Sequence, residues 1–298
     1  MGFAILTTVL WSLSTVLANK SRQSVGAMRA NLGRLFLALL FLGVWAFGFG
    51  GGFGGAGRDW FLVSGVVGMG LGDLAFFGSL ALLGSRMTIV ISQCLSVPIA
   101  ILVEWLWLGT RLSGAQLACS TVILAGITLA LWPKKRADGG AAKFSGAGLF
   151  VATLAAAGQG VGAVLSRKGF ELAALAGEPT DGLTAAFQRI VGGIVFTVLW
   201  FVVLHWLRTR HQPPAPAPAW RDYRWVVANA FAGPIFGMGT YQMALAVAPS
   251  GIVLPITATT PLLVIPIAYW LEGERPLKRS IAGGVIAVAG AVALTLVR

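Results

Sequence analysis

The sequence has few charged side chains. Asp, Glu, Lys and Arg together make up 11% of the 298 residues, whereas hydrophobic residues make up 57% and the mean hydropathy is +0.83. A water-soluble domain carries about 25% charged residues, so this chain lacks the charge needed to cover a water-facing surface. The composition therefore excludes the soluble class and indicates a membrane protein.

Cysteine, histidine and acidic residues are scarce as well. The two cysteines, Cys94 and Cys119, lie inside apolar runs, and the two histidines, His205 and His211, have no further ligand residues beside them. We therefore expect no disulfide framework, no metal site and no bound cofactor. The 22 basic residues outnumber the 10 acidic ones and give a net charge of +12. Because they lie between apolar runs, they indicate membrane topology and not nucleic-acid binding.

Ten apolar segments are long enough to cross a bilayer, for which a helix needs about 20 residues. Tryptophans gather at the ends of these segments, as in an interfacial aromatic belt. The first segment lacks a cleavage site, and we interpret it as a retained transmembrane helix. The sequence thus predicts an all-α membrane protein with ten transmembrane helices. The predicted spans are residues 2–18, 33–50, 60–82, 86–107, 115–132, 145–165, 185–206, 223–247, 250–271 and 280–297.

The second half of the chain repeats features of the first. With an offset of 165 positions, Gly68 and Gly72 match Gly233 and Gly237. An odd number of spans per copy requires the two copies to insert with opposite orientation, which is the inverted-repeat plan of secondary transporters. The predicted domains are a first five-helix repeat (1–133), a basic linker (134–144) and a second five-helix repeat (145–298).

The distribution of basic residues agrees with this inversion. Sixteen of the 22 Lys and Arg residues fall in or beside the loops that follow odd-numbered spans. These loops follow the odd-numbered helices of the first copy but the even-numbered helices of the second. The positive-inside rule then places them in the cytoplasm and both chain ends outside it.

The ninth span and its exit read Pro261-Leu262-Leu263-Val264-Ile265-Pro266, then Leu271-Glu272-Gly273-Glu274-Arg275. A proline-bearing helix that ends in a Gly-Glu-Arg-like turn before a glycine-rich last helix resembles the EamA-type repeat of the drug/metabolite transporter (DMT) superfamily. The stretch Gly72-Asp73-Leu74-Ala75-Phe76-Phe77 looks like one EamA subgroup, although Thr110 stands where the second copy has Glu274. The resemblance covers nearly the whole chain. It implies a ten-helix inverted-repeat bundle that moves small metabolites, often outward, with spans 5 and 10 outside the central site.

Asp73 is the sharpest candidate for a functional residue. An ionisable side chain in the middle of a span is costly and tends to face a cavity or a partner. Asp73 either carries protons, binds a substrate amine, or has a structural role, in which it pairs with Arg34 or bonds to a backbone gap near the glycines. The sequence Gly70-Leu71-Gly72-Asp73 also spells the GxGD signature of aspartyl intramembrane proteases. That mechanism needs two carboxylates, and because no other aspartate lies in mid-span, we do not expect a protease.

Two matching spans carry stripes of polar side chains at helical spacing. Such groups either line a wet pathway or bond to neighbouring helices, and the stripes alone do not decide between the two. The members are Ser85, Thr88, Ser92, Gln93 and Ser96 in the fourth span, and Ser250, Thr257 and Thr260 in the ninth.

Further mid-span residues are candidates for lining or moving the pathway. Aromatic walls with a few polar groups suit an amphipathic ligand, and prolines can kink helices that gate access; static packing is the alternative for each. The candidates for the cavity are Trp11, Phe76, Phe77, Gln159, Tyr241 and Gln242. The candidates for kinks are Pro98, Pro234, Pro255, Pro261 and Pro266.

Charged residues and small residues near helix ends have simpler interpretations. Long charged side chains near span ends are expected to reach the membrane interface; these are Arg34, Glu104, Arg189 and Glu272. Glycines four residues apart, Gly68 with Gly72 and Gly158 with Gly162, predict close helix packing.

Together these features predict a secondary transporter and not an enzyme. It would move a small amphipathic metabolite, such as an amino acid, across the cell inner (cytoplasmic) membrane by alternating access. Efflux is the favoured direction, and proton coupling and exchange both stay open. The expected partners are the small-molecule substrate and the lipid bilayer, without nucleic acid, and the chain is expected to be a monomer or weak homo-oligomer. The alternatives are a multidrug exporter, a membrane-embedded enzyme and a passive channel.

Overall fold

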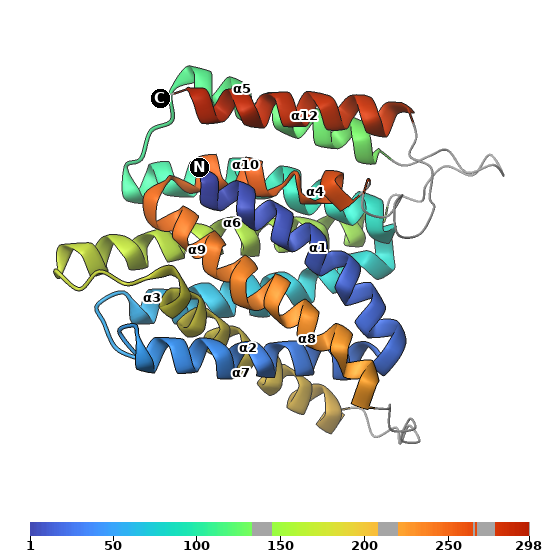
Figure 1. The fold of residues 1–298 in the computed structure, drawn as a ribbon. Coiled ribbons are helices and arrows are strands. Elements are labelled where there is room, and N and C mark those ends of the chain that lie inside the picture. Colours follow the sequence, from blue (N-terminus) through green and yellow to red (C-terminus); the bar gives the residue numbers. More distant parts are fainter. Residues whose placement is uncertain (133–144, 208–219, 265, 267–277, 298) are drawn as a thin grey trace.

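A computed structural model describes residues 1–132, 145–207, 220–264, 266 and 278–297, with the backbone alone described at 27, 28, 81, 84–86, 201 and 204–207. Within these ranges all regular structure is helical. Eight helical segments are apolar and long enough to cross a membrane. This confirms the all-α membrane class, while the count of ten crossings stays a prediction. The first helix begins and the last one ends at the same end of the bundle (Figure 1).

The first half of the chain folds into five helices and one π-helical segment. Helix α1 continues beyond its predicted end and stops only at Gly26, whose φ of 85° favours glycine and ends the helix. The elements are α1 (Gly2–Val25), α2 (Ala27–Gly48), α3 (Arg58–Gly65), η1 (Val66–Gly72), α4 (Asp73–Leu108) and α5 (Gly114–Leu131).

Helix α4 joins two segments that the sequence separated. The predicted connection between residues 82 and 86 is helical, because a backbone inside a membrane protein is best satisfied by its own helix hydrogen bonds. The continuous helical stretch formed by α3, η1 and α4 still contains two apolar segments of spanning length, Arg58–Leu80 and Met87–Leu108. The ribbon changes direction between them at the right of Figure 1.

The second half repeats this arrangement with more interruptions. Helix α6 runs ten residues past its predicted end and carries polar residues such as Arg167 and Lys168 in its last turns. The span expected at 250–271 is described only as far as residue 264 and at 266. The elements are α6 (Gly146–Leu175), α7 (Gly182–Leu207), η2 (Trp220–Tyr223), α8 (Arg224–Ala230), η3 (Phe231–Ile235), α9 (Phe236–Val247), α10 (Ser250–Thr257) and α12 (Lys278–Leu296).

The two π-helical segments occupy equivalent places in the two halves. Segment η1 begins at Val66 and η3 begins at Phe231, 165 positions later, which is the offset of the sequence repeat. Both are rich in residues that weaken a regular α-helix: three glycines in η1, and Gly233 with Pro234 in η3. The duplication therefore extends to the geometry of the backbone. Because π-helical segments often lie at functional sites, the two segments are also candidates for a functional role.

Glycine seams hold α6 against η1. A methyl group on Gly158 would lie 2.7 Å from Cα of Gly72, and one on Gly162 would lie 3.1 Å from Cα of Gly68. The two glycine pairs singled out in the sequence therefore face each other. The packing is so close that a larger residue at Gly158 requires the backbones to separate.

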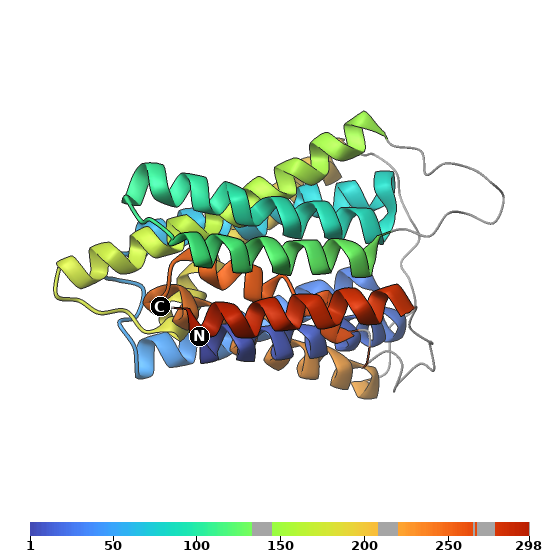
Figure 2. The same ribbon diagram turned by 90° about the horizontal axis from the view of Figure 1, so that it is seen from above.

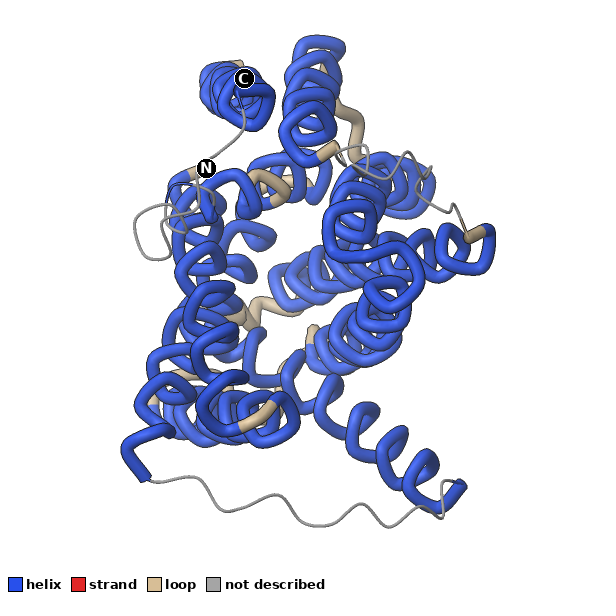
Figure 3. The backbone as a smooth tube through the Cα atoms, turned by 90° about the vertical axis from the view of Figure 1, so that its right-hand side faces the viewer, coloured by secondary structure: helices blue, strands red, loops and turns tan. Residues whose placement is uncertain are grey.

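Helices α5 and α12 form a pair on the outside of the bundle. They run side by side in Figure 2, and Figure 3, which looks along many of the helices, shows them apart from the rest. Small residues bring them together: a methyl group on Gly126 would lie 2.6 Å from the backbone nitrogen of Ala287. The largest buried cluster among the described residues extends from this pair into the bundle and includes Ile123 of α5, Tyr241 and Leu254.

Candidate functional site

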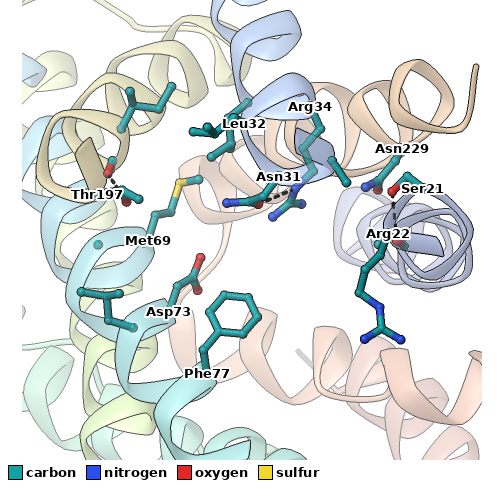
Figure 4. Close-up of a pocket in the computed structure, with 17 residues that line it drawn as sticks. Ser21, Arg22, Asn31, Leu32, Arg34, Met69, Asp73, Phe77, Thr197 and Asn229 are labelled. Atoms are coloured by element: carbon teal, nitrogen blue, oxygen red, sulfur yellow. Dashed lines mark hydrogen bonds between the residues drawn. The ribbon is translucent and has the colours of Figure 1, made fainter. Parts of the chain in front are cut away.

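A cavity of about 570 Å³ lies at one end of the bundle. Its walls come from the last turns of α1, the first turns of α2, the junction of η1 with α4, the second half of α7 and one residue of α8. Figure 4 shows the side chain of Asp73 on one wall and those of Asn31 and Arg34 on the facing wall. Because the lining is mostly apolar, a few polar groups decide what it binds. They are Ser21, Arg22, Asn31, Arg34, Asp73, Thr197 and Asn229.

The acidic wall is built by one face of a single helical run. Met69, Asp73 and Phe77 follow each other at steps of four residues, so all three project toward the cavity. Asp73 is the first residue of α4, directly after the glycine-rich π-helical segment. Among the described residues its carboxylate has no ion-pair or hydrogen-bond partner and is open to the cavity.

The basic wall keeps its donors available. The Nε atom of Arg34 donates to Oδ1 of Asn31 over 2.9 Å, and an Nη2 atom of Arg22 donates to Oδ1 of Asn19 over 3.3 Å. Each guanidinium has five N–H groups, so most stay free to bind an anion. The guanidinium of Arg34 and the carboxylate of Asp73, which carry opposite charges, lie on facing walls of the cavity. Arg34 therefore faces a cavity, which corrects the expectation that it reaches the membrane interface.

A largely buried ion pair lies at the opposite end of the bundle, beside a smaller pocket of about 230 Å³ that Arg167 lines. Oε1 of Glu104 lies 3.2 Å from Nε of Arg167, and Oε2 of Glu104 accepts hydrogen bonds from the backbone nitrogen (2.7 Å) and the hydroxyl of Ser250. Arg167 also donates to the carbonyl of Leu245 over 2.8 Å. Glu104 is 2% exposed, so the prediction that it reaches the interface was wrong: its partners are supplied by the other half of the chain.

Arg189 is buried in mid-bundle, not at the interface as the sequence predicted. It is 4% exposed, and its Nη1 atom donates to Oγ of Ser166 (3.0 Å) and weakly to the carbonyl of Gly162 (3.4 Å). Its guanidinium carbon lies 5.7 Å from the ring centre of Tyr241. Glycine at position 68 leaves room for the guanidinium between η1 and α6. Position in the helix predicted exposure, but tertiary packing determined burial.

Three of the predicted site residues join Arg189 instead of the cavity. The rings of Trp11 and Tyr241 are 5.0 Å apart, and Nε2 of Gln242 donates to Oγ of Ser166 over 3.2 Å. Nε of Arg189 and Oε1 of Gln242 are buried without a hydrogen-bond partner in the described part of the chain. This central cluster joins α1, α6, α7 and α9.

The remaining candidates lie apart from the cavity, and of the predicted cavity residues only Asp73 and Phe77 line it. Phe76 packs edge-on against Phe77 with ring centres 6.0 Å apart, while Gln93 and Gln159 are half-buried. Several hydroxyls of the two polar stripes donate to carbonyls of their own helices, three residues back. They are Ser92, Ser96, Thr257 and Thr260.

The prolines interrupt helices in the second half of the chain more than in the first. Pro98 lies within the continuous helix α4 with an exposed side chain, whereas Pro234 lies in η3 and Pro255 within α10. Pro261 is in the turn of helix over residues 260–264, and Pro266 is at the edge of the described chain. Any role in gating stays a prediction.

The sequence did not single out Ser21, Asn31 or Asn229 as site residues. Each lies near the end of a helix, where polar residues are ordinary, and only their convergence on one cavity marks them. Among the described residues no three His, Cys, Asp or Glu side chains gather as metal ligands.

Comparison with known proteins agrees with the fold. The model of the EamA-like transporter family matches residues 1–132 and 146–296. A solved structure described only as the crystal structure of a protein is 18% identical, and the match covers 99% of this chain and 95% of the other with a TM-score of 0.72. At this identity the likeness shows the fold alone. A search of curated proteins gives no match.

Proposed function

Because the chain belongs to the EamA-like transporter family of the DMT superfamily, we propose that it carries a small amphipathic metabolite across the cytoplasmic membrane by alternating access. The observation that supports this most is the cavity among its apolar helices, where a free carboxylate, Asp73, faces the guanidinium of Arg34. Charges of both signs in one apolar cavity suit a zwitterion such as an amino acid. The carboxylate of the substrate would bind Arg34, and its amine would bind Asp73.

The two ends of the bundle differ as an alternating-access cycle requires. The cavity reaches the end where α1 stops and α2 starts, while helices α2 and α7 pack tightly toward the other end through Leu42, Phe187 and Ile190. The Glu104–Arg167 pair lies at that closed end. We therefore interpret the structure as one of the two access states.

The basic loops suggest which side is open. Among the described residues, most Lys and Arg lie in elements at the end that holds the cavity, for example Lys20, Arg22, Arg224 and Lys278, and the positive-inside rule would place that end in the cytoplasm. A cytoplasm-facing cavity suits loading of an exporter, which favours efflux. We propose ten crossings, two of which are α8 to α9 and the apolar segment that begins with Ser250–Val264; because ten is an even number, both chain ends would then lie on the same side, outside the cytoplasm.

The enzyme alternative gains little support. Asp73 is the only carboxylate among the residues that line the cavity in the described part of the chain. An aspartyl protease needs two such groups in contact. A transporter needs only one group that binds or exchanges a proton.

Counterflow in proteoliposomes tests the proposal. Vesicles loaded with a mixture of unlabelled amino acids should accumulate a labelled member of the mixture transiently, and Arg34→Gln should abolish the accumulation. Arg58→Gln is the matched control, because Arg58 lies outside the cavity and pairs with the exposed Asp59. Absence of counterflow for every amino acid would reject this substrate class.

A further inference from the structure

An apolar groove continues the cavity toward the lipid. It has a volume of about 410 Å³ and lies between α2 and α7. Four residues line both the cavity and the groove, so the two spaces adjoin; they are Leu32, Leu35, Ile194 and Thr197. The groove itself contains almost no polar surface, and its other walls are apolar side chains and glycine.

The groove exists because α2 and α7 diverge. Toward the closed end Ala38 and Leu42 of α2 pack against Ala186 and Ile190 of α7, all of them buried. One to two turns further along, the two helices present a gap instead of a contact. Figure 3 shows the end of α7 leaving the bundle.

The walls of the groove face the hydrocarbon region. Phe36 is 59% exposed and Val198 is 46% exposed, and both belong to segments that are apolar and long enough to span the membrane. Apolar walls of this kind suit hydrocarbon chains better than water. The groove therefore connects the charged cavity sideways with the bilayer.

Resting on the proposed function, we propose that the substrate is a single-chain zwitterionic amphiphile that enters from the bilayer between α2 and α7. Its amino and acid groups would occupy the cavity, between Asp73 and Arg34. Its hydrocarbon chain would lie in the groove along Leu35, Phe36 and Val198. Both volumes fall within the range of about 300–1,000 Å³ that is common for ligand sites. An α-amino acid with a long alkyl side chain has this chemistry.

A chain-length series tests the inference in protein reconstituted into lipid nanodiscs. The labelled probe is 2-aminododecanoic acid, and binding is counted only where unlabelled probe displaces it and empty discs do not retain it. The competitors are 2-aminobutyric, 2-aminohexanoic and 2-aminooctanoic acids, with dodecanoic acid and dodecylamine as head-group controls. We expect displacement to strengthen with chain length and both single-charge controls to compete poorly.

Two tryptophan substitutions on α7, one that fills the groove and one that does not, test whether the groove binds the alkyl chain. Thr197→Trp fills the junction between groove and cavity, whereas Val195→Trp adds the same ring to a lipid-exposed position of α7 outside both spaces. Thr197→Trp should weaken binding of 2-aminododecanoic acid by about tenfold or more, the order expected for overpacking a fitted site. Val195→Trp should leave it unchanged.

The outcomes separate this inference from the proposed function. If short amino acids show counterflow and chain length has no effect on binding, the groove does not bind the alkyl chain, but the proposed transport function stands. The same conclusion follows if the two tryptophan variants behave equally. If the long probe binds and is displaced but no counterflow is seen, the groove binds the alkyl chain and the proposed transport function is rejected. Equal competition by dodecylamine overturns the zwitterionic head.

Discussion

Glu104 and Arg167 belong to opposite halves of the chain and form an ion pair of 3.2 Å at the end of the bundle away from the cavity. The same carboxylate accepts the first backbone N–H of α10 at Ser250. A negative charge at a helix N-terminus is favourable. One side chain of the first half thus anchors two helices of the second half.

Glu104→Gln should destabilise this closed end. The amide keeps the size of the side chain but leaves Arg167 without its counter-charge, and breaking a buried pair costs about 3–5 kcal/mol. We expect a clearly lower Tm in a thermal shift assay. The control is Lys168→Gln, which removes an exposed pair with Glu171 worth about 0–1 kcal/mol. Equal losses in the two variants would mean that Glu104 and Arg167 do not lock the helices.

Asp73→Asn should abolish the pH dependence of transport if Asp73 carries protons. Asparagine has a similar shape but cannot exchange a proton, so counterflow rates measured across a pH series should become flat. Asp59→Asn is the control, because Asp59 is 73% exposed and lies outside the cavity. A variant that keeps normal expression and the pH profile of the wild type would remove Asp73 from coupling.

Arg189→Met should separate stability from transport. Among the described residues Arg189 has no ion-pair partner, so an apolar side chain of similar length removes its desolvation cost without stranding a counter-charge, and Tm should stay equal or rise. Transport should fall strongly, because a buried intramembrane charge is costly to the fold and is therefore usually retained for a function. A large loss of Tm with normal transport per folded molecule would show that Arg189 serves only the packing between α6 and α7.

Gly158→Val should weaken the seam between α6 and η1. The added side chain would meet Gly72 at less than the contact distance, and overpacking costs roughly 1–3 kcal/mol. The Tm should fall by several degrees. Gly146→Ala in the same helix is the control, since nothing described lies within 4 Å of the added methyl group, and it should be neutral or stabilising. If Gly146→Ala lowered Tm more than Gly158→Val, the close packing of α6 against η1 would not contribute to stability.

Cysteine labelling should report which end faces the cytoplasm. In a background where Cys94 and Cys119 are serine, Ala176→Cys lies at the closed end and Gln23→Cys at the cavity end, both exposed. An impermeant maleimide added to intact cells should label Ala176→Cys alone. Labelling of Gln23→Cys alone would mean that the cavity opens outward, which favours uptake over efflux.

Much of the fold was predictable from the sequence, because lipid allows few solutions for a backbone. Long apolar runs had to be helices, and the offset of 165 positions anticipated the matching π-helical segments. Boundaries were less predictable, as at Val25 and over residues 82–86, because a helix continues through polar residues when its backbone has no better partner.

The sequence by itself determined that this chain is a duplicated, helical membrane protein with one conspicuous acid, Asp73, because composition and periodicity report how each helix meets lipid. Only the tertiary structure decided that Arg34 faces that acid across a cavity while Arg189 is buried, and that Glu104 pairs with Arg167. The reason is physical: whether a charged side chain near a helix end is exposed, paired or buried depends on the helix packed beside it, and that neighbour comes from a distant part of the chain.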